Sequence, residues 1–224
     1  MPAAKRTPKR HNKGVRQTNN QKYEITDIAH EQYPFLHRIR ALRDIGPDVR
    51  AGDLGGFVES GRNLSFEVGD DAWIYDDAIA CNDGYVDQGS VLRGQAVVCD
   101  SGYISRRAVL SGHSRVEDGA YVRGATLSAH ARVSGYAVVR CSRETGHAPS
   151  LSGHCVVCGN VSGDVRLTGS AVIISGEELH NDTPDTLVMD GQSRSVIRDP
   201  SRDKLAPQAP EPQKAKSKKR EMER

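Results

Sequence analysis

The sequence predicts an all-β protein built as a single-stranded parallel β-helix, and three observations support this prediction. An aliphatic residue recurs every six positions between residues 68 and 122, and a small residue follows each of them four positions later. The chain is also rich in glycine (22 residues) and poor in aromatic residues (5%). The aliphatic positions are Val68, Ile74, Ala80, Val86, Leu92, Val98, Ile104, Leu110, Val116 and Val122, and the small positions are Ala72, Ala78, Gly84, Ser90, Ala96, Gly102, Ala108, Ser114, Ala120 and Thr126.

A period of six excludes the regular alternatives. An α-helix buries one face with a period of about 3.6 residues, and a half-buried strand alternates with a period of about two. Repeated hexapeptides are instead the signature of a parallel β-helix, in which three hexapeptides form one triangular coil. We expect the aliphatic residue to fill the interior of the coil and the small residue to fit where the chain bends.

Charge divides the chain into an acidic body between two basic ends. Residues 1–22 carry seven Lys or Arg and no acid, and residues 199–224 carry eight against five acids, which leaves about −8 on residues 23–198. Both ends lack the aliphatic clusters that could offset the entropy of ordering them. We therefore predict a disordered basic arm at 1–22 and a disordered basic, Pro- and Lys-rich tail at 199–224.

Residues 23–66 precede the repeat and differ from it. Residues 35–42 alternate as a strand does, and glycines at positions 52, 55 and 56 mark turns. The first coil of a β-helix exposes unpaired backbone groups unless another element covers it. We therefore predict that residues 23–66 form an N-terminal β cap.

Beyond Val122 the repeat continues with two slips. Residues 140–150 lack the small-residue pattern and are expected to form an irregular corner or a protruding loop. The β-helix is therefore predicted at 67–175, with about six coils, followed by closing strands at 176–198. The interior positions expected after the slips are Leu127, Val133, Val139, Thr145, Leu151, Val157, Val161, Leu167 and Ile173, with Val165 and Ala171 in the smaller positions.

The five cysteines do not form a disulfide framework of the kind seen in short secreted chains. Cys81 and Cys99 are one coil apart, so they should lie side by side at the strand spacing of about 4.8 Å. This spacing permits a disulfide, but a reducing cytoplasm favours free thiols. Cys155 and Cys158 form a C-x-x-C pair without a second pair at zinc-site spacing, and Cys155 occupies a small interior position, so no metal site is predicted.

Two segments resemble the N-terminal signature of a group of bacterial and prophage hexapeptide-repeat proteins. They are residues 38–45 (RIRALRDI) and residues 49–58 (VRAGDLGGFV), and a tryptophan-containing strand and repeats such as residues 131–135 (ARVSG) follow them. The resemblance covers residues 23–175 and implies a left-handed β-helix. Members of the group are mostly uncharacterised, and some are described as acetyltransferases by analogy with hexapeptide-repeat enzymes.

The resemblance to these acyl-CoA-dependent enzymes makes His113 and His130 the candidate catalytic residues, because such enzymes use a histidine as general base. Both histidines, like His154, directly precede a small interior position, and we expect the first two to stack on adjacent coils. Acids and other polar residues occupy the same position elsewhere, which favours a solvent-exposed corner without a catalytic role. Acetyl-CoA or another acyl-CoA would be the cosubstrate of such an enzyme, whereas a scaffold requires no cofactor.

We expect a non-enzymatic structural or interaction protein that recognises a macromolecular partner, a protein rather than a nucleic acid, through its faces and basic tails. An acyl-CoA-dependent O- or N-acyltransferase is the alternative, and the sequence leaves open whether the chain is an enzyme. Phosphate contact is the weaker role for the basic ends, because aromatic residues for base stacking are missing. The residues concerned are Lys5, Arg6, Lys9, Arg10, Lys13, Arg16, Lys218, Lys219 and Arg220.

The sequence also leads to expectations about the location and the assembly of the protein. No apolar run approaches the ~18 residues of a membrane span, and no secretory signal is visible, so we expect a cytoplasmic protein of a bacterial or phage-infected cell with no membrane partner. Hexapeptide relatives are commonly trimers, and the resemblance implies a homotrimer. Val91, Val97 and Val109 are the outward aliphatic residues expected to form its contact stripe.

Overall fold

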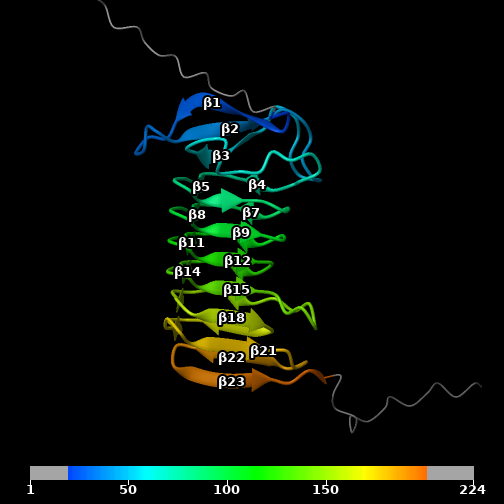
Figure 1. Ribbon diagram of the computed structural model, residues 1–224, viewed down its shortest axis with the longest axis vertical. Coiled ribbons are helices and arrows are strands. Elements are labelled where there is room, and N and C mark those ends of the chain that lie inside the picture. Colours follow the sequence, from blue (N-terminus) through cyan, green and yellow to red (C-terminus); the bar gives the residue numbers. More distant parts are fainter. Residues whose placement is uncertain (1–19, 201–224) are drawn as a thin grey trace, which may run out of the picture.

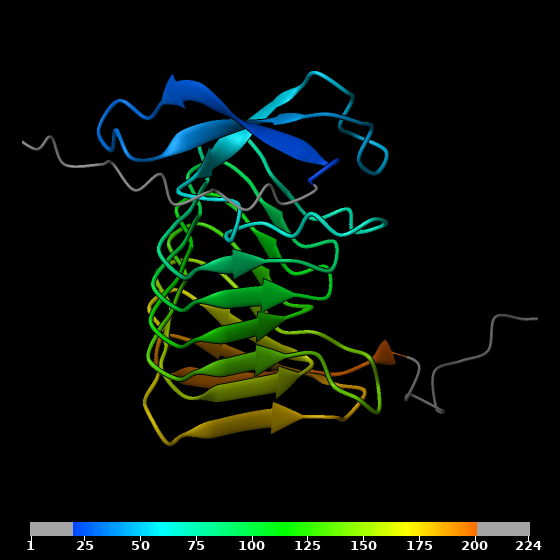
Figure 2. The same ribbon diagram turned by 45° about the horizontal axis from the view of Figure 1, so that its top comes forward.

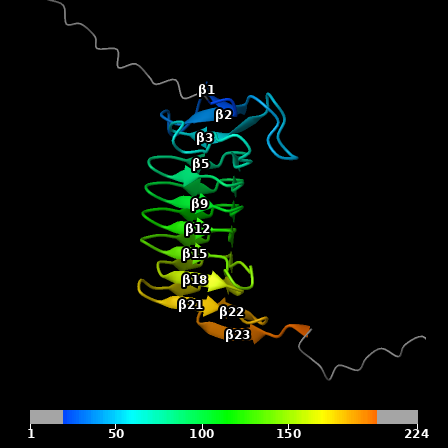
Figure 3. The same cartoon turned by 45° about the vertical axis from the view of Figure 1, so that its right-hand side comes forward.

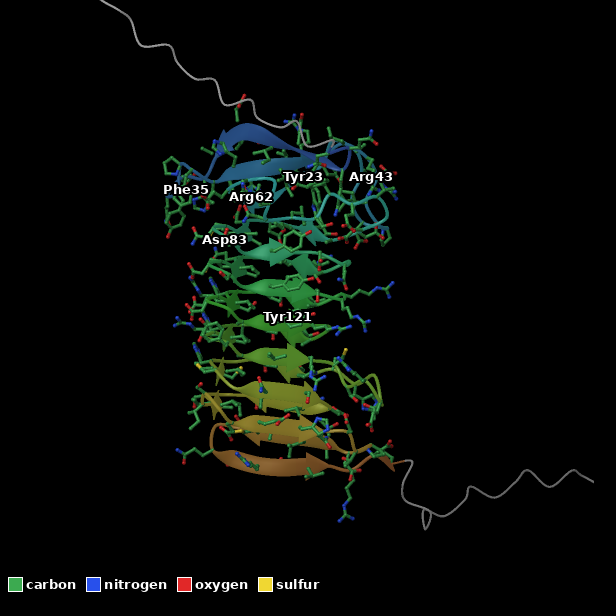
Figure 4. The ribbon with its side chains drawn as sticks, in the orientation of Figure 1. Tyr23, Phe35, Arg43, Arg62, Asp83 and Tyr121 are labelled. Atoms are coloured by element: carbon green, nitrogen blue, oxygen red, sulfur yellow. The ribbon has the colours of Figure 1, made fainter. Side chains whose placement is uncertain are left out.

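The computed structural model describes residues 20–200 and shows an all-β solenoid, as predicted. Parallel strands stack into a rod, with the cap strands at one end and the last strands of the chain at the other (Figure 1). A view turned about the vertical axis shows the same regular stack of coils (Figure 3). The handedness that the resemblance implies stays a prediction.

Three sheets make up the sides of the rod, and the chain visits them in the order II, I, III. Sheet I contains β1 (Tyr23–Ala29), β2 (His37–Ala41), β3 (Leu54–Val58), β5 (Ile79–Ala80), β8 (Val97–Val98), β11 (Arg115–Val116), β14 (Arg132–Val133), β17 (Val156–Val157) and β20 (Val172–Ile173). Sheet II contains β4 (Trp73–Ile74), β7 (Val91–Leu92), β10 (Val109–Leu110), β13 (Thr126–Leu127), β16 (Ser150–Leu151), β19 (Val165–Thr168), β22 (Thr186–Asp190) and β23 (Ser193–Ile197). Sheet III contains β6 (Tyr85–Val86), β9 (Tyr103–Ser105), β12 (Tyr121–Arg123), β15 (Val138–Arg140), β18 (Asn160–Gly163) and β21 (Glu178–Asn181).

The parallel coils occupy more of the chain than residues 67–175. β3 already pairs in parallel with β5, so the first coil begins inside the predicted cap. At the other end, β21 and β22 pair in parallel with β18 and β19, and only β23 turns back antiparallel. The solenoid therefore has about seven turns rather than the six predicted.

The predicted interior is confirmed over most of the repeat. The aliphatic positions from Ile74 to Val122 are fully buried, and the alanines and serines at the small positions are buried with them. The positions after the two slips are equally buried, namely Leu127, Val133, Val139, Leu151, Val157, Val161, Leu167 and Ile173. Burial of one aliphatic side chain in each strand is the main stabilisation of the rod.

Three predicted interior positions are wrong. Val68 is 93% exposed, and Leu64 fills the interior instead, where it forms a bridge with Val86. Thr126 is exposed, and Ala125 takes the small position. Thr145 is exposed within the loop at 141–149. In each case the chain turns at a point where the six-residue count assumes a regular hexapeptide.

The slips are corners of different length. The corner after β9 contains Arg106 and Arg107, whereas the equivalent corner after β12 contains only Gly124 and is one residue shorter. At the second slip, a Cβ added to Gly159 would overlap the backbone carbonyls of Ile174 and Glu177. Glycine is needed there because the two coils approach too closely for any side chain.

The N-terminal cap covers the first coil, as Figure 2 shows from an oblique angle. The Tyr23 hydroxyl donates to the carbonyl oxygen of Leu64 (2.9 Å), and its ring meets that of Trp73 edge-on, with centroids 6.4 Å apart. Lys22, assigned by sequence to the disordered arm, is instead buried and donates from Nζ to the Ser65 carbonyl (2.9 Å). Burial lowers the pKa of Lys22 to about 8.

The loop at 141–149 inserts between β15 and β16 and projects from the rod as the yellow-green segment of Figure 1, which confirms the predicted protruding loop. Cys81 and Cys99 are free thiols on adjacent coils, and Cys155 is fully buried in the interior. Within residues 20–200, no helix is long and apolar enough to cross a membrane.

The three outward valines do not form one stripe. Val91 and Val109 are register partners in sheet II, but Val97 lies in sheet I, where its partners are Ile79 and Arg115. The homotrimer stays a prediction, and its proposed contact stripe is wrong because the six-residue count does not separate one side of the coil from the next.

Candidate functional site

His113 and His130 lie at the corner between sheets II and I, and they stack as predicted. Their ring centroids are 4.8 Å apart with an interplanar angle of 1°. His154 extends the stack, with its ring 4.6 Å from that of His130 at 4°. All three are exposed, and we call this feature the histidine corner. His147, which has the same 17-residue spacing, lies in the loop with its Nδ1 3.4 Å from Asp164.

The histidine corner has no partner that would orient a general base. A catalytic histidine needs a group on its second nitrogen to fix the tautomer and the ring orientation. Among the described residues, no carboxylate or hydroxyl lies within hydrogen-bonding distance of the ring nitrogens of His113, His130 or His154, whose side-chain contacts are the stacks themselves. The arrangement therefore fits a solvent-exposed corner better than a catalytic site.

A different histidine does have partners on both nitrogens. The Nδ1 of His180, on β21, shares a hydrogen bond with the Ser162 hydroxyl (2.7 Å), in which either atom can be the donor. The Nε2 of His180 lies 2.8 Å from an Asp182 carboxylate oxygen. Ser162 and His180 are register partners on adjacent strands. A nucleophile, a base and an orienting acid are thus connected, although the serine is buried and contacts the opposite nitrogen from that in the usual serine triad.

An ion-pair network lies on the outer face of sheet I. Glu117, whose side chain is 8% exposed, contacts Arg115 Nε (3.2 Å) and the Arg132 guanidinium on the next coil. Arg115 also approaches the thiol of Cys99 (3.9 Å). The buried carboxylate neutralises part of the charge of the two arginines, so this network is a structural feature of the sheet.

Arginines gather at a second corner, between sheets III and II, which we call the arginine corner. Arg106 follows β9, Arg123 ends β12 and Arg140 ends β15, and Arg123 and Arg140 are direct register partners. Together with Arg143 of the loop they surround a pocket of about 480 Å³. Arg140 and Arg143 lie in the irregular segment at 140–150, and that segment alone does not connect them with the other two.

The sequence contains a signal for this corner, because Arg106, Arg123 and Arg140 are each 17 residues apart, as His113 and His130 are. The signal is incomplete, since His147 has the same spacing and does not join the histidine stack. The residues proposed to contact nucleic acid or a partner, Lys5, Arg6, Lys9, Arg10, Lys13, Arg16, Lys218, Lys219 and Arg220, lie outside the described residues.

Comparison with known proteins gives no family for this chain. No protein-family model matches it, and no curated protein is found that resembles it in sequence. Among residues 20–200, no group of three or more His, Cys, Asp or Glu side chains is placed to hold a metal ion.

Proposed function

We propose that the protein is a non-enzymatic scaffold of bacterial or prophage type, which binds a macromolecular partner through the outer faces of its β-helix and its basic tails. The observation that supports this proposal is a banded charge along the rod. Residues 59–100 hold nine acids and two arginines, residues 101–143 hold seven arginines and two acids, and residues 144–190 hold seven acids and one arginine. Because successive coils stack, these segments become three bands along the axis (Figure 3).

The bands favour a protein over a nucleic acid as the partner. A duplex carries a uniformly negative backbone, so the acidic bands on both sides of the basic one would repel it. A protein surface can instead place acidic side chains opposite the basic band and basic side chains opposite its neighbours. Such complementarity mainly provides specificity and fast association. The rod offers an extended patterned surface of the kind that repeat proteins use for recognition.

The test is a comparison of captured partners between matched charge variants. The full-length wild type is immobilised at low salt and compared with two variants. Arg107→Glu reverses one exposed charge of the basic band, and Arg50→Glu, the control, reverses a charge on the cap. The proposal expects proteins that the wild type and Arg50→Glu retain and Arg107→Glu loses, with no effect of nuclease treatment. Capture that survives in Arg107→Glu, or that nuclease abolishes, contradicts it.

One observation favours acyl transfer as a second candidate, now with His180 rather than His113 or His130 as the base. His180 is the described histidine whose ring is bonded both to a hydroxyl and to a carboxylate. The measurement is release of free thiol from acetyl-CoA in the presence of a panel of amine and hydroxyl acceptors. Release that His180→Ala abolishes and His130→Ala leaves intact supports this candidate. An equal rate in both variants, or no release above background, contradicts it.

A further inference from the structure

Four arginine side chains share one pocket at the arginine corner. The pocket has a volume of about 480 Å³ and is lined by Arg106, Arg123, Arg140, Cys141, Ser142, Arg143 and Gly146. The lining thus includes four arginines and no acidic residue. A guanidinium group keeps its charge at any pH that a folded protein tolerates, so these charges cannot be relieved by losing protons.

The charges are not balanced by other described residues. None of the four arginines forms an ion pair with any Asp or Glu among residues 20–200, whereas Arg38, Arg40, Arg50, Arg93, Arg115, Arg132 and Arg194 all do. Asp164, on the coil that follows, is engaged by the Thr186 hydroxyl (3.0 Å) and by His147. The arginine corner therefore gathers four unpaired positive charges in one place, whereas seven of the other twelve described arginines form ion pairs.

One donor of a pocket-lining arginine is both buried and unsatisfied. The Nε of Arg123 has no hydrogen-bond partner among the described residues. Buried donors are almost always paired, so the Arg123 guanidinium lacks both a counter-charge and an acceptor for this donor among the described residues. Arg123 belongs to the central of the three coils and is the register partner of Arg140, so this donor lies in the middle of the arginine cluster.

Two arginines at this corner adopt a left-handed backbone conformation. Arg106 and Arg107 both have positive φ angles (54° and 58°), a conformation that favours glycine. The equivalent corner of the preceding coil uses Gln88 and Gly89, and that of the following coil uses Gly124. Gln88 is the position equivalent to Arg106, so a left-handed residue with a polar side chain occurs at this corner in both coils.

Two other pockets of the described residues lack this character. One, of about 510 Å³, is lined by Arg107 together with the acidic Glu67, Asp70 and Asp71, and the second is larger. This second pocket lies under the cap, has a volume of about 620 Å³, and its one arginine, Arg38, is already bonded to the carbonyls of Gly55 and Asp76 and stacked over the Phe57 ring. Its positive charge is further paired with Asp77. An anion would find no free guanidinium group there, so the arginine corner is the stronger anion site.

We propose that the arginine corner binds a small molecule through a chain of two or more phosphoryl groups. Arginine forms bidentate hydrogen bonds with phosphate oxygens, and three of the four arginines come from successive coils, which are about 4.8 Å apart. The cluster thus extends over about 10 Å along the rod, which one phosphate cannot fill and a diphosphate or triphosphate group can. This site goes beyond the proposed scaffold function and does not depend on it.

The test is a calorimetric titration of the full chain with tripolyphosphate, pyrophosphate and inorganic phosphate. We expect one molecule of tripolyphosphate bound per chain, weaker binding of pyrophosphate, still weaker binding of inorganic phosphate, and loss of affinity as salt is added. Arg123→Gln and Arg140→Gln should each weaken tripolyphosphate binding by about tenfold or more. Arg123→Lys, which keeps the charge and loses the planar fork, should lie between these variants and the wild type.

Two controls separate this site from the basic ends of the chain. Arg50→Gln removes the same charge from the cap, and the double variant Lys218→Gln/Lys219→Gln removes charge from the C-terminal tail, and both should bind as the wild type does. Arg143→Gln, on the exposed loop, replaces Arg123→Gln if the latter does not fold. Equal affinity in the wild type and the arginine-corner variants would overturn the proposal, as would binding of a DNA oligonucleotide in preference to tripolyphosphate.

Discussion

The histidine corner and the arginine corner belong to the same coils and show opposite outcomes of one constraint. A β-helix places equivalent side chains about 4.8 Å apart on successive coils, whether or not they attract one another. At the histidine corner the rings stack nearly parallel at 4.6–4.8 Å. At the arginine corner the side chains instead surround a pocket. Imidazole can be uncharged and guanidinium cannot, so the arginines need a counter-charge that the histidines do not.

Lys22 is a third case, at the cap. Like the arginines it is a cation with few counter-charges, but a buried ammonium group can lose its proton, and burial does lower its pKa to about 8. The chemistry of each basic side chain thus decides how it is accommodated. The histidines stack, the lysine has a lowered pKa, and the arginines keep an unbalanced charge.

The largest expected effect tests how closely the coils approach beside the arginine corner. A Cβ added to Gly163 would overlap the carbonyl oxygen of Asn181, whereas one added to Gly176 would meet nothing within 4 Å, and both glycines have φ of +82°. Gly163→Ala should therefore destabilise the protein by about 3 kcal/mol or more and Gly176→Ala by about 1 kcal/mol. Urea unfolding of both variants measures the difference, and equal losses would show that the coils can separate.

The next effect concerns the pH dependence that Lys22 confers. Its pKa is lower in the folded protein than in the unfolded chain, so the unfolded chain binds more protons and stability rises as the pH increases from about 8 towards 10.5. The gain relative to Lys22→Met should reach roughly 2 kcal/mol. Denaturant unfolding of both proteins at several pH values between 7 and 10 measures this gain in stability. A variant with the same pH dependence as the wild type would show that Lys22 is hydrated.

The next prediction compares an unpaired arginine with a paired one. Their removal should change the stability by smaller amounts and in opposite directions. Arg123→Gln removes an unpaired charge and a buried unsatisfied donor, and it should stabilise the ligand-free protein by about 1 kcal/mol at low salt. Arg115→Gln removes a partner of buried Glu117 and should destabilise by a similar amount. Chemical unfolding at low and high salt measures both, and both effects should shrink as salt screens the charges. Destabilisation by Arg123→Gln would mean that its charge is already balanced.

The smallest effect tests the histidine stack. His130→Ala removes the central ring and should cost about 0.5–1 kcal/mol, because aromatic stacking at an exposed site contributes little. Tripolyphosphate affinity should not change, since the two corners are separated by sheet II. Thermal unfolding and calorimetry of the same sample check both points. A change of affinity in His130→Ala would show that the corners are coupled.

Much of the fold follows from the local sequence, and its exceptions have a common cause. The interior column from Ile74 to Val122 is predicted correctly because an aliphatic side chain every six residues has only one consistent burial pattern. The prediction that Val68 is interior is wrong because residues 60–71 form an irregular turn that places Leu64 in the interior. The prediction for Lys22 is wrong because its ammonium group donates a hydrogen bond to the Ser65 carbonyl, which is 43 residues away in the sequence.

The candidate sites were predictable only in part. The 17-residue spacing predicts the His113–His130 stack, but the insertion at 141–149 replaces His147 with His154 as the third ring. The same spacing occurs in Arg106, Arg123 and Arg140, yet it carries no information about what faces them. Ser162, His180 and Asp182 give no sequence signal, because the serine and the histidine meet through pairing of β18 with β21.

By itself, the sequence determined the coil and the column of side chains inside it, because the interior accepts only apolar residues at a fixed repeat. The tertiary structure alone decided which outward side chains meet and which stay unpaired. Corner length sets that register, and a corner can gain or lose residues without changing the interior. The arginine corner is the clearest example, since its four charges become one site only when three coils and a loop are stacked together.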